Sequence, residues 1–118
     1  MILKDFKSGW QEKYEERIQR ILTMFPNASI KRVHRFFGTL QIDFESLDND
    51  AQFILDCISY KIARTSGKIC ESCGNGTRGI KKDDRLPEPM SLCWKCYALE
   101  IDSWESRNRA GQIPQNEE

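Results

Sequence analysis

The residues most able to do chemistry in this sequence are two cysteine pairs, Cys70-Glu-Ser-Cys73 and Cys93-Trp-Lys-Cys96. Residues 74–92 separate the pairs, a spacing within the about 15 to 20 residues typical of zinc sites. Each C-x-x-C turn presents two thiolates to one ion, and Gly74 permits the positive φ of a zinc knuckle. We therefore predict that Cys70, Cys73, Cys93 and Cys96 bind one Zn²⁺. Four thiolates leave no position for water, so this zinc is expected to be structural.

Three other interpretations of the same cysteines remain open. Two disulfides would suit a secreted chain, but the N-terminus lacks the apolar stretch of a secretory signal. A thioredoxin-type redox pair requires a strand before its helix, and no βαβ pattern is present. An iron–sulfur cluster or another metal would fit the same four thiolates.

The segment around the cysteines is poor in apolar residues, which favours a metal as the source of its order. Between Lys68 and Asp84 the large aliphatic residues are Ile69 and Ile80. Zinc binding supplies about 10–16 kcal/mol in isolated finger peptides. The expected order is a knuckle, a short hairpin through residues 77–82, a loop and a helix with the last two ligands, as in a treble clef; a zinc ribbon is the alternative.

The N-terminal part shows a helical period, a strand period and a second helical period. A helix is predicted over residues 9–25, with Ser8 as its N-cap. Residues 28–44 alternate with a period of two and predict a hairpin that turns at Phe37-Gly38. A second helix is predicted to bury a stripe that includes Phe53, Ile54, Cys57, Ile58 and Ile62, which makes Cys57 a small buried apolar residue.

A third helix is expected from about Ser91 to Asn108, with Tyr97, Ile101 and Trp104 buried. The predicted fold class is α+β, with a single domain over residues 1–109. Residues 1–67 form its helix–hairpin–helix part and residues 68–109 its zinc unit. Residues 110–118 are small and polar and are expected to be a disordered tail.

Composition restricts the class of protein. The chain has 118 residues, with 18 Lys and Arg against 18 Asp and Glu. A formal net charge of zero gives no long-range attraction for polyanions. No apolar segment approaches the about 20 residues that span a bilayer. We therefore expect a cytoplasmic protein without membrane association, most simply a monomer.

The sequence lacks the usual signs of catalysis. His34 is the single histidine, and residues 68–109 contain none, which argues against a nuclease of the His-metal treble-clef type. No phosphate-binding loop, dinucleotide fingerprint, zincin motif or nucleophile elbow occurs. We therefore expect no enzymatic activity, although a thiol redox function is a minor alternative.

With these motifs placed, the chain resembles a group of small bacterial and phage zinc-finger proteins. The resemblance extends over roughly residues 9–100. It depends on the order of Gly9-Trp10, a basic-aromatic segment at 33–40, Ala63-Arg64-Thr65, Cys70-Glu-Ser-Cys73-Gly74 and Leu92-Cys93-Trp-Lys-Cys96. Relatives often carry His at the fourth ligand, where this chain has Cys96. The resemblance implies a zinc-stabilised α+β domain and transfers no activity.

The function expected from these observations is non-catalytic binding of a protein partner, as an immunity protein, an inhibitor or a phage accessory protein would do. The alternative is nucleic-acid binding through basic residues at 31–35 and 78–82. Within residues 31–85 basic residues exceed acidic ones by only two, ten against eight. This small excess favours the protein partner.

Overall fold

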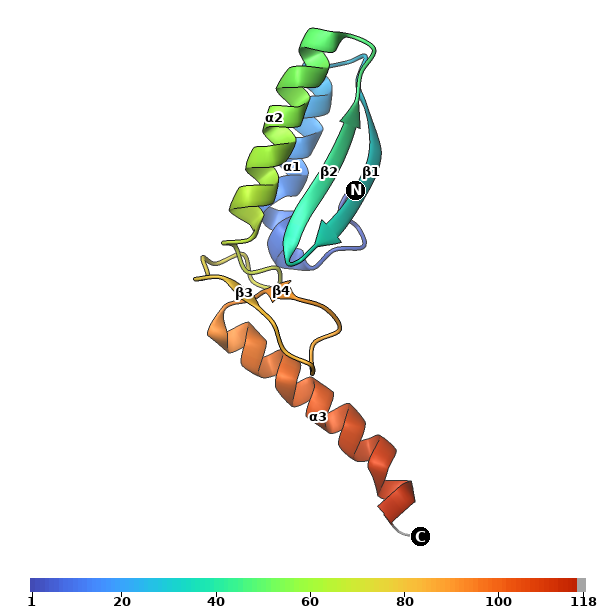
Figure 1. Cartoon of the computed structure of the whole chain (residues 1–118), viewed down its shortest axis with the longest axis vertical. Coiled ribbons are helices and arrows are strands. Elements are labelled where there is room, and N and C mark those ends of the chain that lie inside the picture. The colour runs from blue at the N-terminus through green and yellow to red at the C-terminus, as the bar shows by residue number, and fades with distance from the viewer. Residues whose placement is uncertain (117–118) are drawn as a thin grey trace.

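The computed structural model describes residues 1–116 and confirms the α+β prediction. Its elements are α1 (Ser8–Met24), β1 (Ser29–Phe36), β2 (Thr39–Glu45), α2 (Asn49–Ser66), β3 (Ile80–Lys81), β4 (Met90–Ser91) and α3 (Trp94–Asn116). Figure 1 shows α1 and α2 beside the β1–β2 hairpin, with α3 projecting from the opposite end of the molecule. The segment that contains the two C-x-x-C pairs lies between these two parts.

The main core lies where α1, α2 and β2 meet. Trp10, Tyr14, Ile18 and Ile21 form the buried stripe of α1, as its helical period predicts. They pack with Leu40, Ile42 and Phe44 from β2 and Leu55 and Ile62 from α2. Leu3, from the segment before α1, is fully buried in the same core.

The β1–β2 hairpin turns at Phe37 and Gly38, as predicted. Both residues have positive φ, 49° and 75°, which matches the twist of a two-residue hairpin turn. The outer edge of β2 is covered by α2, because three polar side chains of that helix bond to the β2 backbone. Ser66 Oγ accepts from Leu40 N at 2.7 Å, Gln52 Nε2 donates to Phe44 O at 3.0 Å, and Ser59 Oγ donates to Ile42 O.

The prediction of which residues of α2 are buried is wrong for Phe53, Ile54 and Cys57. The helix buries Leu55, Ile62 and Ser66, whereas Phe53 is 70% exposed and Cys57 is also exposed. The apolar residues of α2 occupy two faces, and Ser66 and Ser59 turn the inner face toward β2 because they bond to its backbone. The interpretation of Cys57 as a buried apolar residue is therefore corrected.

The C-terminal part also differs from the prediction. β3 pairs antiparallel with β4 across the loop 82–89, so the hairpin does not close within residues 77–82. Leu86, Met90 and Leu92 form a small second core with Cys70 and Cys96. The Pro87–Pro89 region thus lies inside the hairpin, and its flanking apolar residues return to the cysteines.

The bounds of α3 are shifted at both ends. The helix starts at Trp94, because Ser91 belongs to β4, and it continues to Asn116. The helix therefore includes residues 110–116, which the sequence analysis assigned to a disordered tail, and the order of that tail stays a prediction. Residues 117–118 lie outside the described residues. Tyr97, Ile101 and Trp104, which were predicted to be buried, are half-buried, and the first two pack against the second core.

Candidate metal centre

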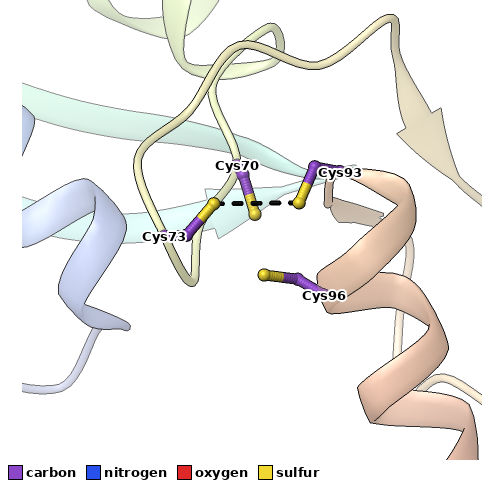
Figure 2. A group of neighbouring side chains, drawn as sticks. All are labelled: Cys70, Cys73, Cys93 and Cys96. Carbon is purple, nitrogen blue, oxygen red and sulfur yellow. Dashed lines mark hydrogen bonds between the residues drawn. The ribbon is translucent and has the colours of Figure 1, made fainter.

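The four cysteines of the two C-x-x-C pairs lie together. Their Sγ atoms are all within 4.8 Å of one another. Figure 2 shows Cys70 and Cys73 on the loop after α2, with Cys93 at the start of α3 and Cys96 in its first turn. Cys70 and Cys96 are buried, while Cys73 is exposed. The cluster therefore has an inner side against the second core and an outer side near solvent.

The spacing of the sulfur atoms fits a tetrahedral zinc site. Zinc–sulfur bonds of about 2.3 Å place two ligating sulfurs about 3.8 Å apart. The Sγ atoms of Cys73 and Cys93 are 3.7 Å apart, much longer than the about 2.05 Å of a disulfide. All four cysteines are free thiols. The cluster can hold a metal ion, and four thiolates at this spacing fit zinc.

Backbone hydrogen bonds shape the first pair into a knuckle. Cys70 N donates to Asn75 O at 2.7 Å, and Gly74 N donates to Cys70 O at 2.9 Å. Gly74 has a φ of 80°, as predicted for the glycine after the pair. A bridge between Ile69 and Gly76 closes the base of the loop. The two thiols are therefore fixed by the backbone.

The second pair uses the start of α3. The backbone N–H of Cys96 hydrogen-bonds the Cys93 sulfur and lowers the pKa of that thiol to about 7, as helix N-termini do for cysteines. Burial raises the pKa of the Cys96 thiol. A divalent cation would supply the positive charge that the buried thiolate lacks.

The knuckle packs directly on the N-terminus of α1, a contact that the sequence did not predict. Trp10 N donates to Glu71 O at 3.2 Å, and Ser8 Oγ donates to Ser72 O at 2.9 Å. Ser8 therefore does not cap α1, whose N-cap is Lys7. A Cβ on Gly9 would lie 2.4 Å from Cys70 O. Glycine at this position is what lets the helix backbone approach the knuckle.

An ion pair behind the site was also missed. Glu71, between the first two ligands, has a side chain only 1% exposed and pairs with Arg35 from β1. Its other carboxylate oxygen accepts from Ser91 N at 2.9 Å. Arg35 also pairs with Glu88 and lies 5.5 Å from the Trp10 ring centroid. Burial raises the pKa of Glu71, and Arg35 opposes that shift. Glu71 thus joins β1, the knuckle and β4.

The remaining candidate residues lie outside the cluster. His34 is half-buried on β1, within the hairpin with β2. Arg32 pairs with Asp43 at 3.2 Å. Lys81 Nζ lies 4.3 Å from the ring centroid of Trp94. The basic residues expected at 31–35 and 78–82 are therefore partly engaged within the molecule.

Comparison with known proteins adds no assignment. No protein-family model, curated protein or solved structure matches the chain. The resemblance to small zinc-finger proteins stays a prediction from the motifs. In the part of the chain that the structure describes, no helix has the length and apolar character needed to cross a bilayer. The fold and the four-cysteine cluster together suggest a zinc-binding module.

Proposed function

We propose that this zinc-binding module is non-catalytic and binds another protein through the solvent side of α2. The observation that supports this is an exposed set of apolar residues on that helix, here named the outer stripe: Phe53, Ile54, Cys57 and Tyr60. Phe53 is 70% exposed and Tyr60 is 64% exposed. Positions 53, 57 and 60 share one helix face.

The outer stripe differs from scattered surface apolar residues. It lies opposite the face that buries Leu55 and Ile62, so α2 is apolar on two sides. A helix with apolar residues on both sides is typical of one that packs between two partners. Among the described residues, β2 and the core occupy one side only. Contiguous exposed apolar surface of this kind favours a protein interface.

A groove beside the outer stripe offers a place for an anchoring side chain. It has a volume of about 480 Å³ and lies between α2 and β2, and Tyr60 of the outer stripe is among its lining residues. Its apolar lining comes from Ile42, Phe44 and Ala63, and its polar lining includes Asp43 and Asp56. Such a pocket suits a large apolar or aromatic side chain of the partner, as interface hot spots require.

The metal centre has a supporting role in this proposal. Four thiolates would close the first shell of the zinc, so the ion would stabilise the fold and perform no reaction. An immunity, inhibitor or phage accessory role is the kind of function such a module would serve. The compartment and the monomeric state expected from the sequence are part of the same proposal.

The test compares two double variants, each of which replaces two large exposed side chains with serine. Phe53→Ser/Tyr60→Ser changes the outer stripe, and Phe36→Ser/Leu99→Ser changes two other exposed residues, at 58% and 60% exposure. A protein that co-purifies in stoichiometric amount after nuclease treatment is purified, and its affinity for each variant is measured by calorimetry. We expect the stripe variant to lose at least about tenfold in affinity, and the control to bind like the wild type.

Two outcomes contradict the proposal. One is an equal loss of affinity in both double variants, because the outer stripe would then contribute no more to partner binding than other exposed apolar residues do. The other is concentration-dependent self-association of the purified chain, abolished by the stripe substitutions. That result would assign the outer stripe to a second copy of this chain.

A further inference from the structure

A second surface, distinct from the outer stripe, has the character of an anion-binding groove. It consists of two neighbouring hollows that share Lys68. The first, of about 390 Å³, is lined by Arg17, Lys61, Arg64, Thr65 and Lys68. The second, of about 550 Å³, is lined by Lys68, Gly76, Thr77, Arg78, Cys93 and Trp94. We name the two together the basic groove.

The cations of the basic groove have no carboxylate partner among the described residues, although Cys93, one of the four thiolates that would give the metal centre a net negative charge, lines the second hollow. Neither hollow has an acidic residue in its lining. Among the side chains that the structure describes, the ion pairs formed within 4.0 Å use the cations Lys7, Arg32, Arg35 and Arg85. All five basic side chains of the groove are absent from these pairs.

The C-terminus of α2 accounts for only part of this arrangement. A cation in the last turn of a helix offsets the partial negative charge there, and Arg64 occupies such a position. Arg17 comes from α1, whereas Lys68 and Arg78 come from the loop around the knuckle. Cations from three separate segments therefore meet along one groove. Five cations outnumber the net charge of about −2 that four thiolates and one Zn²⁺ would carry, so the field along the groove stays positive although the net charge of the chain is zero.

An exposed aromatic ring lies at the zinc-site end of the basic groove. Trp94 is 69% exposed although it begins α3. Its ring is held edge-on to Tyr97, with centroids 5.8 Å apart. Lys81 Nζ covers one face at 4.3 Å from the centroid. The ring is thus fixed in position and largely open to solvent, as a stacking platform requires.

We propose that the basic groove binds single-stranded nucleic acid, with phosphates along Arg17, Lys61, Arg64, Lys68 and Arg78 and one base stacked on Trp94. The combination of a cationic groove with an aromatic platform is how proteins bind single strands without reading sequence. A duplex would offer the phosphates but keep its bases stacked within the helix. A run of acidic residues alone, such as polyglutamate, would offer charge but no planar ring for Trp94.

The experiment measures the affinity of the zinc-loaded full chain for a fluorescein-labelled oligothymidine of about ten nucleotides by anisotropy. Arg64→Glu/Lys68→Glu reverses two charges in the basic groove. Lys4→Glu/Lys31→Glu makes the same net change at two exposed lysines outside it. Trp94→Ala removes the stacking ring, and Trp94→Phe retains an aromatic face. Zinc content and thermal unfolding of each variant are measured alongside, because Trp94 lies between two ligands.

We expect wild-type binding to weaken as the salt concentration rises. If all five cations contact phosphates of a single strand, the plot of log K against log salt concentration should have a slope of about −3.5, and fewer contacts would make it shallower. The groove variant should lose at least about tenfold in affinity and about 1.4 of that slope, while the lysine control keeps both. Trp94→Ala should lose about tenfold, and Trp94→Phe should recover most of it.

Three results would overturn the proposal. The first is equal loss in the groove variant and the lysine control, because net charge alone would then explain binding. The second is equal affinity for polyglutamate of similar length, which would assign the basic groove to an acidic protein. The third is no measurable binding of oligothymidine at low salt by zinc-loaded protein.

Discussion

The buried pair between Arg35 and Glu71 gives a quantitative test of how the zinc unit is attached to the rest of the fold. The Glu71 side chain is 1% exposed and that of Arg35 is 25% exposed. In Arg35→Ala the Glu71 carboxylate would stay buried with one hydrogen bond, from Ser91 N. Removing one partner of a buried pair costs about 3–5 kcal/mol. Because Arg35 is partly solvated, we expect the lower end, about 3 kcal/mol.

The matched control is Arg32→Ala, which removes an exposed pair on the same strand. The side chains of Arg32 and Asp43 are 66% and 45% exposed, so its loss should cost at most about 1 kcal/mol. Both free energies of unfolding are measured by urea titration of zinc-loaded protein, followed by tryptophan fluorescence. Glu71→Gln introduced into Arg35→Ala should restore part of the loss, because it removes the uncompensated charge.

The pH dependence follows from the sign of the Glu71 shift. Burial raises the pKa of Glu71 above its ordinary value, and loss of Arg35 raises that pKa further. A carboxyl with a raised pKa in the folded state loses stability as the pH rises through that value. The deficit of Arg35→Ala should therefore shrink as the pH falls through the raised pKa of Glu71 toward the ordinary value of a glutamate. A deficit no larger than that of Arg32→Ala, or one independent of pH, would refute the reasoning.

Three further predictions test the packing and the metal centre. Cys70→Ser should lose zinc and become protease-sensitive after residue 67, measured by metal analysis and limited proteolysis; unchanged thermal stability would contradict this. Gly9→Ala should destabilise the fold by about 1–3 kcal/mol, because the added Cβ would lie 2.4 Å from Cys70 O. Gly76→Ala is the control and should leave the stability unchanged, because no atom lies within 4 Å of its added Cβ. Leu55→Ala should cost about 2–5 kcal/mol by chemical denaturation and Cys57→Ala almost nothing; comparable losses would mean that α2 is rotated.

Local patterns in the sequence were enough to predict the order of elements. The period of four and three in residues 10–25 predicts the buried stripe of α1, and the period of two after Gly38 predicts the buried face of β2. These predictions succeed because each depends on residues that are neighbours in one element. The C-x-x-C spacing is informative for a similar reason, since each turn fixes two thiols locally.

The phase of α2 could not be predicted in the same way. Its apolar residues occupy two faces, and a hydrophobic period cannot tell which face is buried. Ser59 and Ser66 decide the matter, because they bond to the backbone of β2. Those bonds join residues 17 and 26 positions apart in the chain, and no local pattern contains them.

The support of the candidate site was missed because it comes from long-range contacts. Arg35 and Glu71 lie 36 residues apart, and Ser8 and Ser72 lie 64 apart. In the sequence Arg35 belongs to a basic cluster and Glu71 is a spacer between two cysteines. The one available signal was Gly9 beside Trp10, since a glycine at a helix start indicates close approach of another backbone.

X-ray absorption spectroscopy of the purified chain at the zinc edge tests the central claim most directly. The account predicts one zinc per chain, with four sulfur neighbours at about 2.3 Å. A folded chain that contains no zinc, or a zinc whose nearest neighbours include nitrogen or oxygen, would contradict it.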